Sequence, residues 1–248
     1  MVGQSHCLSL LQGAEASWAE LPAGFEITFV ADWRGTILRA VASRDGLERK
    51  ATTTDQSELF GSIGADDLCL AWWGTQMQIR ALLQVGGPFD VLLPGNGARR
   101  VDGELIPYVA VEGYVRGTLD SDPVLSKLLS EAAGRRWLLA PPAPLPEPAV
   151  RSRLARSPHF VGVLEQMGMR ADEAVIVPEA VRVRLRQLLV ETYREFGRDH
   201  DATLIDAPQD SSDAEGLLKE EYWSTDVTHA NAAYGRLYLL RLLEILGA

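Results

Sequence analysis

The apolar residues of this chain fall into short runs typical of buried strands and longer stretches with helical spacing. Residues 25–30 and 67–73 predict strands, and the second run is apolar almost throughout, as in a strand buried on both faces. Further extended segments are expected at 89–94, 108–111, 137–140 and 202–205. Only Met1 and Val2 precede the first turn, so the first strand is either a stub or begins upstream of Met1. The stretch 31–50 is ambiguous.

Apolar residues at helical spacing fill most of the intervals between these strands. The expected helices cover residues 8–18, 56–63, 122–133, 158–167, 178–196 and 231–246. Asp122 before Pro123 is a typical helix start, since Asp caps free N–H groups and proline fits the first helical position. Strands that alternate with helices indicate an α/β fold with a mostly parallel sheet covered on both faces. Functional residues of such sheets gather where the strands end.

A proline-rich segment at 141–148 has five prolines in eight residues and invites two interpretations. The first is a stiff linker between two domains. The second, which we prefer, is a loop that leaves the carboxyl end of the strand at 137–140. The elements after the prolines supply too few strands for a second core. We therefore expect one domain over residues 1–248.

Composition and charge limit the partners and the cellular compartment that we expect for this chain. Apolar residues make up 46%, which suits a packed globular domain, and the net charge is −10. The arginines at 151–156 and 182–186 are the main basic stretches, and we expect them on solvated helix faces, so nucleic acid is excluded as a partner. Cys7 and Cys69 lack metal or redox spacing and favour a reducing compartment. No apolar run approaches the ~18 residues of a membrane span, so we expect a cytoplasmic protein without a membrane partner.

The strongest chemical signal joins the two ends of the chain. Asp226 lies three residues before His229, on the turn that opens the last helix, and Ser5 lies on the turn that opens the first. A carboxylate that holds an imidazole by one nitrogen lets the other nitrogen take the proton of a serine hydroxyl. The structural alternatives stay open at this point: Ser5 as a helix N-cap, Asp226 or Thr228 as the cap of the last helix, and His229 as a packed or capping residue.

These two blocks carry a family resemblance. Residues 3–6, Gly-Gln-Ser-His, and 226–229, Asp-Val-Thr-His, resemble the first and last signature blocks of the SGNH/GDSL hydrolase superfamily, in a bacterial Gly-Gln-Ser-His variant. The sequence that flanks the second block, at 216–223 and 230–235, is similar to that of uncharacterised SGNH-like proteins. The resemblance implies a three-layer α/β/α sandwich with a mostly parallel, flavodoxin-like sheet of five strands.

The resemblance also implies an activity. It makes the protein a serine esterase, with Ser5 as nucleophile, His229 as general base and Asp226 as the carboxylate that orients it. The expected partner is a small-molecule or saccharide ester, including a short acyl group on a sugar. An O-acyltransferase with the same triad, or a non-catalytic protein that binds a glycan or another partner, is the alternative. The sequence does not indicate an oligomeric state.

One part of the implied oxyanion hole departs from the family pattern. The family uses the N–H of the serine, a glycine after the second strand and an asparagine in a later block. The glycine is either Gly35 or Gly46, and the asparagine position reads Thr75, after Gly74 and before Gln76. Losing one oxyanion donor costs about 3 kcal/mol of transition-state stabilisation. A threonine hydroxyl reaches less far than an asparagine amide, so Gln76, with its longer side chain, is a candidate to replace the missing donor. His6 is expected to line the pocket.

The remaining polar residues do not suggest a cofactor. His6, His159 and His200 have no metal-ligand spacing with Cys, Asp or Glu, so we expect no metal. The glycines at 95–97 lack the third glycine and the following helix of a dinucleotide loop. The sequence also lacks the nucleophile-elbow and P-loop motifs.

Overall fold

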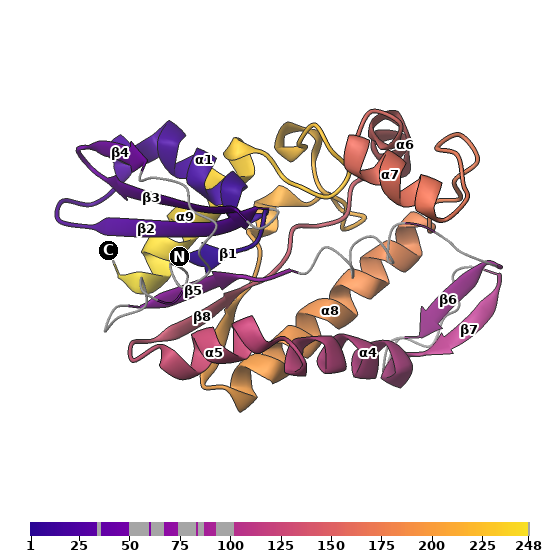
Figure 1. The fold of residues 1–248 in the computed structure, drawn as a ribbon, viewed down its shortest axis with the longest axis horizontal. Helices are drawn as coiled ribbons and strands as arrows, with labels where there is room; N and C mark the ends of the chain where they lie inside the picture. The colour runs from indigo at the N-terminus through magenta and orange to yellow at the C-terminus, as the bar shows by residue number, and fades with distance from the viewer. Residues whose placement is uncertain are drawn as a thin grey trace.

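The structure is a computed structural model that describes residues 1–33, 36–49, 60, 67–73, 83, 87–92 and 102–247. Within these residues a mostly parallel sheet forms the centre of the molecule, in the order β4-β3-β2-β1-β5-β8-β9 (Figure 1). Its strands are β1 (Val2–Gly3), β2 (Glu26–Trp33), β3 (Thr36–Ser43), β4 (Gly46–Arg49), β5 (Leu68–Ala71), β8 (Arg136–Leu139) and β9 (Ala202–Ile205). The α/β class with a mostly parallel sheet is confirmed. The predicted number of five strands was wrong, since this sheet has seven.

The two additional strands come from the stretch that the sequence left ambiguous. β2 pairs in parallel with β1, β3 pairs antiparallel with β2, and β4 pairs antiparallel with β3. Ile37, Ala40 and Ala42 are buried and anchor this edge to the core. Antiparallel strands need only tight turns, so the segment extends the sheet without a crossover helix.

The first strand comprises the two residues Val2 and Gly3. Val2 and Gly3 pair in parallel with β2 on one side and with β5 on the other, so two residues occupy the middle of the sheet. A Cβ atom on Gly3 would lie 2.7 Å from the carbonyl oxygen of Ala71, which only glycine avoids. The tight approach places the turn that follows β1 directly against the end of β5.

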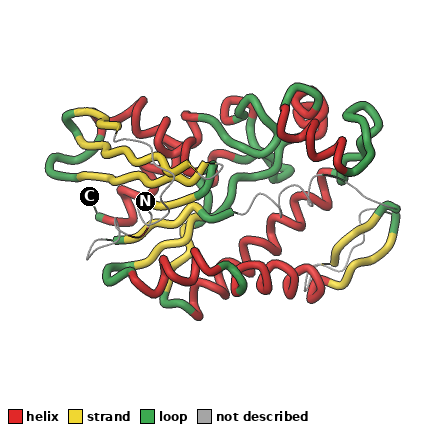
Figure 2. Tube along the Cα trace, in the orientation of Figure 1, coloured by secondary structure: helices red, strands yellow, loops and turns green. Residues whose placement is uncertain are grey.

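The helices divide into two groups. The α1 helix (Cys7–Ser17) packs on α9 (Ala232–Leu246), and α4 (Tyr108–Asp120) packs on α8 (Glu179–Asp199). The connections β1 to β2 and β8 to β9 cross the sheet in opposite directions, so right-handed crossovers place α1 and α8 on opposite faces. The shorter helices are α5 (Pro123–Glu131), α6 (Glu147–Leu154) and α7 (Pro158–Gln166), with 3₁₀ turns at η1 (Trp18–Glu20), η2 (Gln209–Ser211) and η3 (Glu220–Tyr222). Figure 2 shows the loops gathering where the parallel strands end.

Two predicted strands differ in the structure. Residues 108–111 begin α4 instead, because Val111, Val115 and Leu119 recur at helical spacing and Val115 and Leu119 are buried. The strand expected at 89–94 exists as β6 (Phe89–Leu92), but it pairs in parallel with β7 (Glu104–Pro107) in a separate small sheet. The predicted helix at 56–63 lies outside the described residues except for Phe60.

The arginines of α8 are not all on a solvated face, as the sequence had suggested. Arg182 and Arg184 are buried, with 3% and 4% of their surface exposed. Arg184 donates from Nη1 to Asp90 Oδ1 at 3.0 Å, and Asp90 is itself fully buried. A guanidinium can enter a core when a carboxylate or backbone carbonyls accept its protons. This ion pair attaches β6 to α8.

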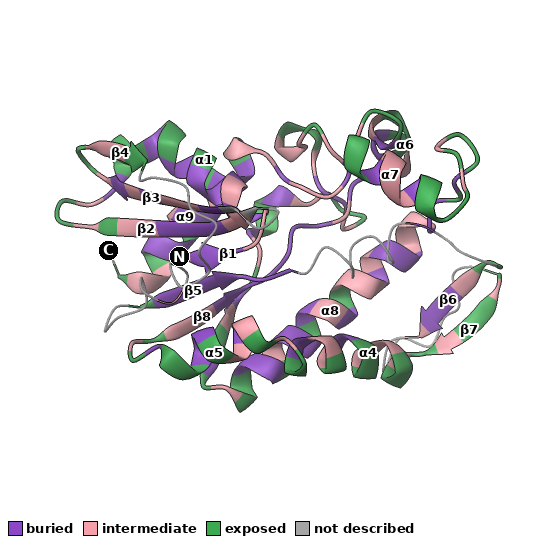
Figure 3. Cartoon of the chain, in the orientation of Figure 1, coloured by how far each residue is buried: buried purple, intermediate pink, exposed green. Residues whose placement is uncertain are grey.

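The proline-rich segment leaves the end of β8 as a loop, as predicted, and the loop continues to Pro146, where α6 follows (Figure 1). Figure 3 shows the central strands and the facing sides of the helices as the buried part of the molecule. Leu10, Phe29, Leu70 and Tyr238 are among the fully buried side chains. None of the described helices combines the length and apolar character that a membrane crossing requires.

Candidate active site

Ser5 lies on the turn between the central strand and the first helix. It follows β1 by two residues and precedes α1, and its carbonyl oxygen accepts the N–H of Leu8 in the first turn. Gln4 donates its N–H to the carbonyl of Ala71 at 3.3 Å, which ties this turn to the end of β5. Ser5 therefore sits at the carboxyl edge of the sheet, as the sequence predicted.

The opposite half of the site is a compact loop before α9. Asp226 Oδ1 accepts the backbone N–H of Thr228 at 2.9 Å and that of His229 at 2.8 Å, which bends the loop back on its own carboxylate. Asn231 caps α9 by accepting the N–H of Tyr234, so Asp226 is not the cap of this helix. The alternative interpretation of Asp226 as the cap is thus wrong, and its second oxygen is left for His229.

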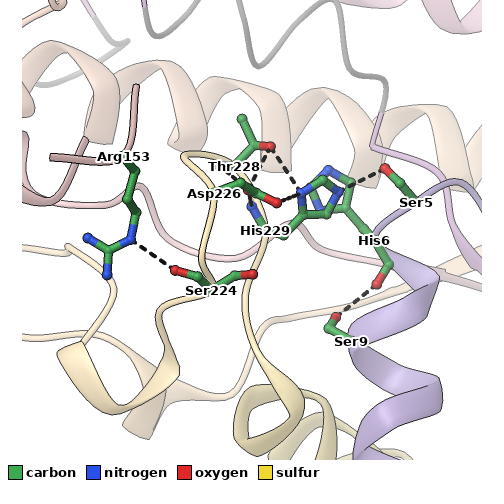
Figure 4. Close-up of polar contacts among 8 residues, drawn as sticks. All are labelled: Ser5, His6, Ser9, Arg153, Ser224, Asp226, Thr228 and His229. Atoms are coloured by element: carbon green, nitrogen blue, oxygen red, sulfur yellow. Dashed lines mark hydrogen bonds and ion pairs between the residues drawn. The ribbon is translucent and has the colours of Figure 1, made fainter. Parts of the chain in front are cut away.

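Side chains of two other segments bind the residues that precede Asp226. Arg153 on α6 donates to the carbonyl of Ser224 at 2.9 Å (Figure 4). Its guanidinium lies over the ring of Trp223, 5.1 Å from the ring centroid. Asn231 donates to the carbonyls of Glu221 and Trp223. These contacts fix both sides of the segment that carries Asp226 and His229.

The two ends of the chain meet because α1 and α9 cross at two glycines. A Cβ atom on Gly235 would lie 1.8 Å from the carbonyl oxygen of Ser9, and one on Gly13 would lie 2.2 Å from the backbone nitrogen of Arg236. The backbones are thus in direct contact, four residues after Ser5 and six residues after His229. Glycines inside predicted helices were the sequence signal for this crossing, and sequence reasoning missed it.

The three predicted residues are brought together by this arrangement (Figure 4). His229 Nε2 lies 2.8 Å from Ser5 Oγ, and His229 Nδ1 lies 2.6 Å from Asp226 Oδ2. A carboxylate accepts hydrogen bonds only, so it holds the proton on Nδ1 and leaves Nε2 as the acceptor for the serine hydroxyl. The geometry is the one that proton removal from Ser5 requires.

The charge state of Asp226 fits this orientation. Burial acts to raise the pKa of its carboxyl, but the hydrogen bond to His229, the charge of a protonated imidazole and the two backbone N–H groups outweigh it. The pKa therefore lies well below its ordinary value. Side chains of Asp226 and His229 are 30% and 27% exposed, so solvent and small molecules reach the pair.

His6 packs beneath the imidazole and is almost fully buried. Its ring stacks on the ring of His229, with 4.2 Å between the two centroids. The centroid of the His6 ring also lies 5.0 Å from that of Trp73. Ser9 donates to the carbonyl of His6 at 2.8 Å. His6 thus supports the His229 ring. The cavity that opens beside His229 is lined by other residues, among them Thr228, and sequence reasoning gave neither Thr228 nor Trp73 a role in the site.

The cysteines offer no competing nucleophile. Cys7, two residues after Ser5, and Cys69 are both free and buried. Burial raises the pKa of the Cys7 thiol to about 12 and that of Cys69 to about 11. A thiol must be deprotonated to react, so neither group is activated.

Of the residues expected to form an oxyanion hole, the structure describes Ser5 and Gly46. Ser5 lies just before α1, where the helix dipole favours negative charge, while the N–H groups of Cys7, Leu8 and Ser9 donate to the carbonyls of the preceding turn. Gly46 pairs with Ser43, which pairs with Glu26 at the start of β2, so it lies at the opposite end of the sheet. It is not the second donor. The other predicted positions, Gly35, Gly74, Thr75 and Gln76, lie outside the described residues.

Among the described residues no three His, Cys, Asp or Glu side chains gather as a metal site would need.

Comparisons with known proteins do not identify a family for this chain. No protein-family model, no curated protein and no solved structure matches this chain. The SGNH/GDSL resemblance stays a prediction that rests on the two sequence blocks.

Proposed function

We propose that this protein is an SGNH-type serine hydrolase that cleaves an ester through an acyl-enzyme on Ser5. The observation that supports it best is the hydrogen-bond chain from Ser5 through His229 to Asp226, with distances of 2.8 and 2.6 Å. Ser5 and His229 are 224 positions apart in the sequence, so their contact depends on the whole fold. A helix cap or a packed histidine would not require this alignment.

The chemistry follows from the positions of the protons. Ser5 Oγ attacks the ester carbonyl while His229 Nε2 takes its proton, and the imidazolium then gives that proton to the departing alcohol. Water attacks the acyl-enzyme with His229 again as base, and the carboxylic acid leaves with Ser5 restored. Asp226 keeps the proton on Nδ1 and stabilises the imidazolium throughout.

The strand order also supports an SGNH-like, three-layer arrangement. Its parallel strands β2-β1-β5-β8-β9 follow the flavodoxin-like order in which the first strand lies between the second and third. Ligands of such sheets bind at the carboxyl ends of the strands, and Ser5 occupies that edge. We further infer a cytoplasmic location, which the free cysteines support.

Thr75 at the position of the oxyanion asparagine favours the non-catalytic alternative, and this residue lies outside the described residues. The assembled triad favours the hydrolase instead. Acyl transfer to another acceptor uses the same steps with an alcohol in place of water.

A fluorophosphonate probe tests the proposal directly. We expect it to label the wild type at one serine, and Ser5→Ala should abolish both labelling and turnover of p-nitrophenyl acetate. Ser17→Ala is the matched control, since Ser17 is a buried serine on α1 that donates to Gly13. His229→Ala should also lose turnover while its circular dichroism spectrum stays that of the wild type. Equal labelling of the wild type and Ser5→Ala would disprove the proposed nucleophile.

A further inference from the structure

A cavity of about 350 Å³ lies between α4, α8 and the proline-rich loop, within the size range of small-molecule sites. α4 contributes Ala110 and Val111, and α8 contributes Leu185 and Leu189. Residues 141–145 form another wall with three prolines and no charged side chain. The surface of the cavity is therefore mostly carbon, unlike a site built for a polar sugar.

One end of this cavity is the candidate active site. Val227, Thr228 and His229 line it, and Ser5 Oγ is 2.8 Å from the imidazole that forms part of its wall. An ester with its carbonyl carbon at Ser5 has one substituent that begins beside the cavity. The catalytic chain and the apolar space thus share His229.

Two arginines of α8 fix the proline-rich wall of the cavity through hydrogen bonds to backbone carbonyls. Arg186 donates to the carbonyls of Pro141 and Pro142, and Arg182 donates to those of Leu145 and Val177. These bonds turn the polar backbone of the proline-rich loop toward α8. They leave its prolines to line the cavity.

The opposite wall is held in a similar way. Phe89 of β6 and Ile106 of β7 line the cavity, and the buried pair of Asp90 with Arg184 attaches β6 to α8. A preformed apolar cavity binds a matching group without the cost of ordering its walls.

We infer, on the basis of the proposed function, that this cavity binds an aliphatic chain of the ester substrate. An acetyl group would leave it unfilled. Each methylene that moves from water into such a cavity improves binding by about fourfold until the cavity is full. The substrate class is therefore an ester with a linear chain of several carbons.

Two substrate series distinguish which side of the ester carries the chain. The first consists of p-nitrophenyl esters from acetate to dodecanoate, in which the acyl group lengthens. The second consists of alkyl acetates from ethyl to dodecyl, in which the alcohol lengthens. We expect kcat/KM below the micelle concentration to rise by about fourfold per methylene in one series and to level off when the cavity is filled.

Ala110→Trp tests the location of the chain. Ala110 lines the cavity from α4, so the indole should lower the ratio of kcat/KM for the long-chain ester to kcat/KM for the two-carbon ester at least tenfold. Val109→Trp is the matched control, because Val109 is the preceding residue, 55% exposed, and does not line the cavity. Leu189→Trp, which fills the cavity from α8, should repeat the effect of Ala110→Trp.

Different experimental outcomes would overturn chain binding in the cavity and hydrolysis at Ser5. If Ser5 is labelled and acetate esters turn over, but kcat/KM is flat or falls with chain length in both series, the cavity does not bind a chain and the hydrolase stands. Chain-length dependence that neither tryptophan in the cavity alters would likewise overturn the location. If Ser5 is neither labelled nor needed for turnover, the hydrolase and the chain inference both fail.

Discussion

The α1–α9 side and the α4–α8 side of the molecule are packed in different ways. On the first side two helix backbones touch at Gly13 and Gly235, with no room for a methyl group. On the second side two helices leave a cavity of about 350 Å³ between their apolar side chains and the proline-rich loop. Under the proposed function, the first side fixes the reacting atoms and the second provides space for the substrate chain. His229 belongs to both.

Each side also contains a pair of an acidic and a basic side chain, and the two pairs differ in how far they are exposed to solvent. Asp90 and Arg184 are at most 4% exposed and hold β6 on α8. Asp226 and His229 are about one-quarter to one-third exposed, at a position where a proton can be exchanged. Substitutions on the two sides should therefore change different measured quantities.

The largest expected effect is on catalysis at the α1–α9 side. Asp226→Asn should lower kcat by about 10⁴-fold, because the amide no longer holds the proton on His229 Nδ1. The measurement is the steady-state rate with a p-nitrophenyl ester. Asp213→Asn is the control, since Asp213 also accepts two backbone N–H groups of its own loop but does not contact the imidazole. A similar loss in both variants would contradict the role of Asp226.

The next largest effect should be on stability at the α4–α8 side. Asp90→Ala removes the carboxylate partner of buried Arg184 and should lower the free energy of unfolding by about 3–5 kcal/mol. Urea denaturation followed by circular dichroism measures it. Asp90→Leu combined with Arg184→Met should recover most of that loss, because no uncompensated charge stays buried. A loss of less than 1 kcal/mol in Asp90→Ala would show that this ion pair does not anchor β6.

A glycine substitution should connect packing with catalysis. Gly235→Ala forces α1 and α9 apart, so we expect about 1–3 kcal/mol of destabilisation. A displacement of about 1 Å between Ser5 and His229 can also lower kcat by about 100-fold. Rates and unfolding should be measured on the same samples at a temperature where the variant is folded. Unchanged kcat in a clearly destabilised variant would separate the helix crossing from the alignment of the site.

Gly117→Ala on α4 is the matched glycine control. An added Cβ there would meet nothing within 4 Å, so we expect a gain of about 0.4–1 kcal/mol and unchanged kcat.

The smallest effect should appear in the pH dependence of stability. The folded-state pKa of Asp226 lies below its unfolded value of about 3.9, so its contribution is complete above that pH and is lost as the pH falls toward the folded pKa. The unfolding free energies of the wild type and Asp226→Asn should differ by about 1 kcal/mol at pH 5 and converge toward pH 2. A difference that stays constant over this range would contradict the depressed pKa.

Much of the site was predictable from the sequence because its residues lie next to helix starts. Ser5 before α1, and Asp226 three residues before His229, are local patterns whose geometry depends on one turn each. The main strands and helices were also predictable, since burial on one or both faces leaves a clear periodicity. Residues 108–111 show the limit of this signal, because a short apolar run is compatible with a strand or with the first turn of a helix.

Only the tertiary structure decided how these local pieces meet. The contact of Gly13 with the α9 backbone aligns Ser5 and His229, and periodicity carries no information on which helix crosses which. The burial of Arg182 and Arg184 depends on acceptors far away in the sequence, the carbonyl of Leu145 and the carboxylate of Asp90, so a helix pattern alone placed these arginines in solvent. The cavity arises in the same way, because it is the space between elements that are distant along the chain.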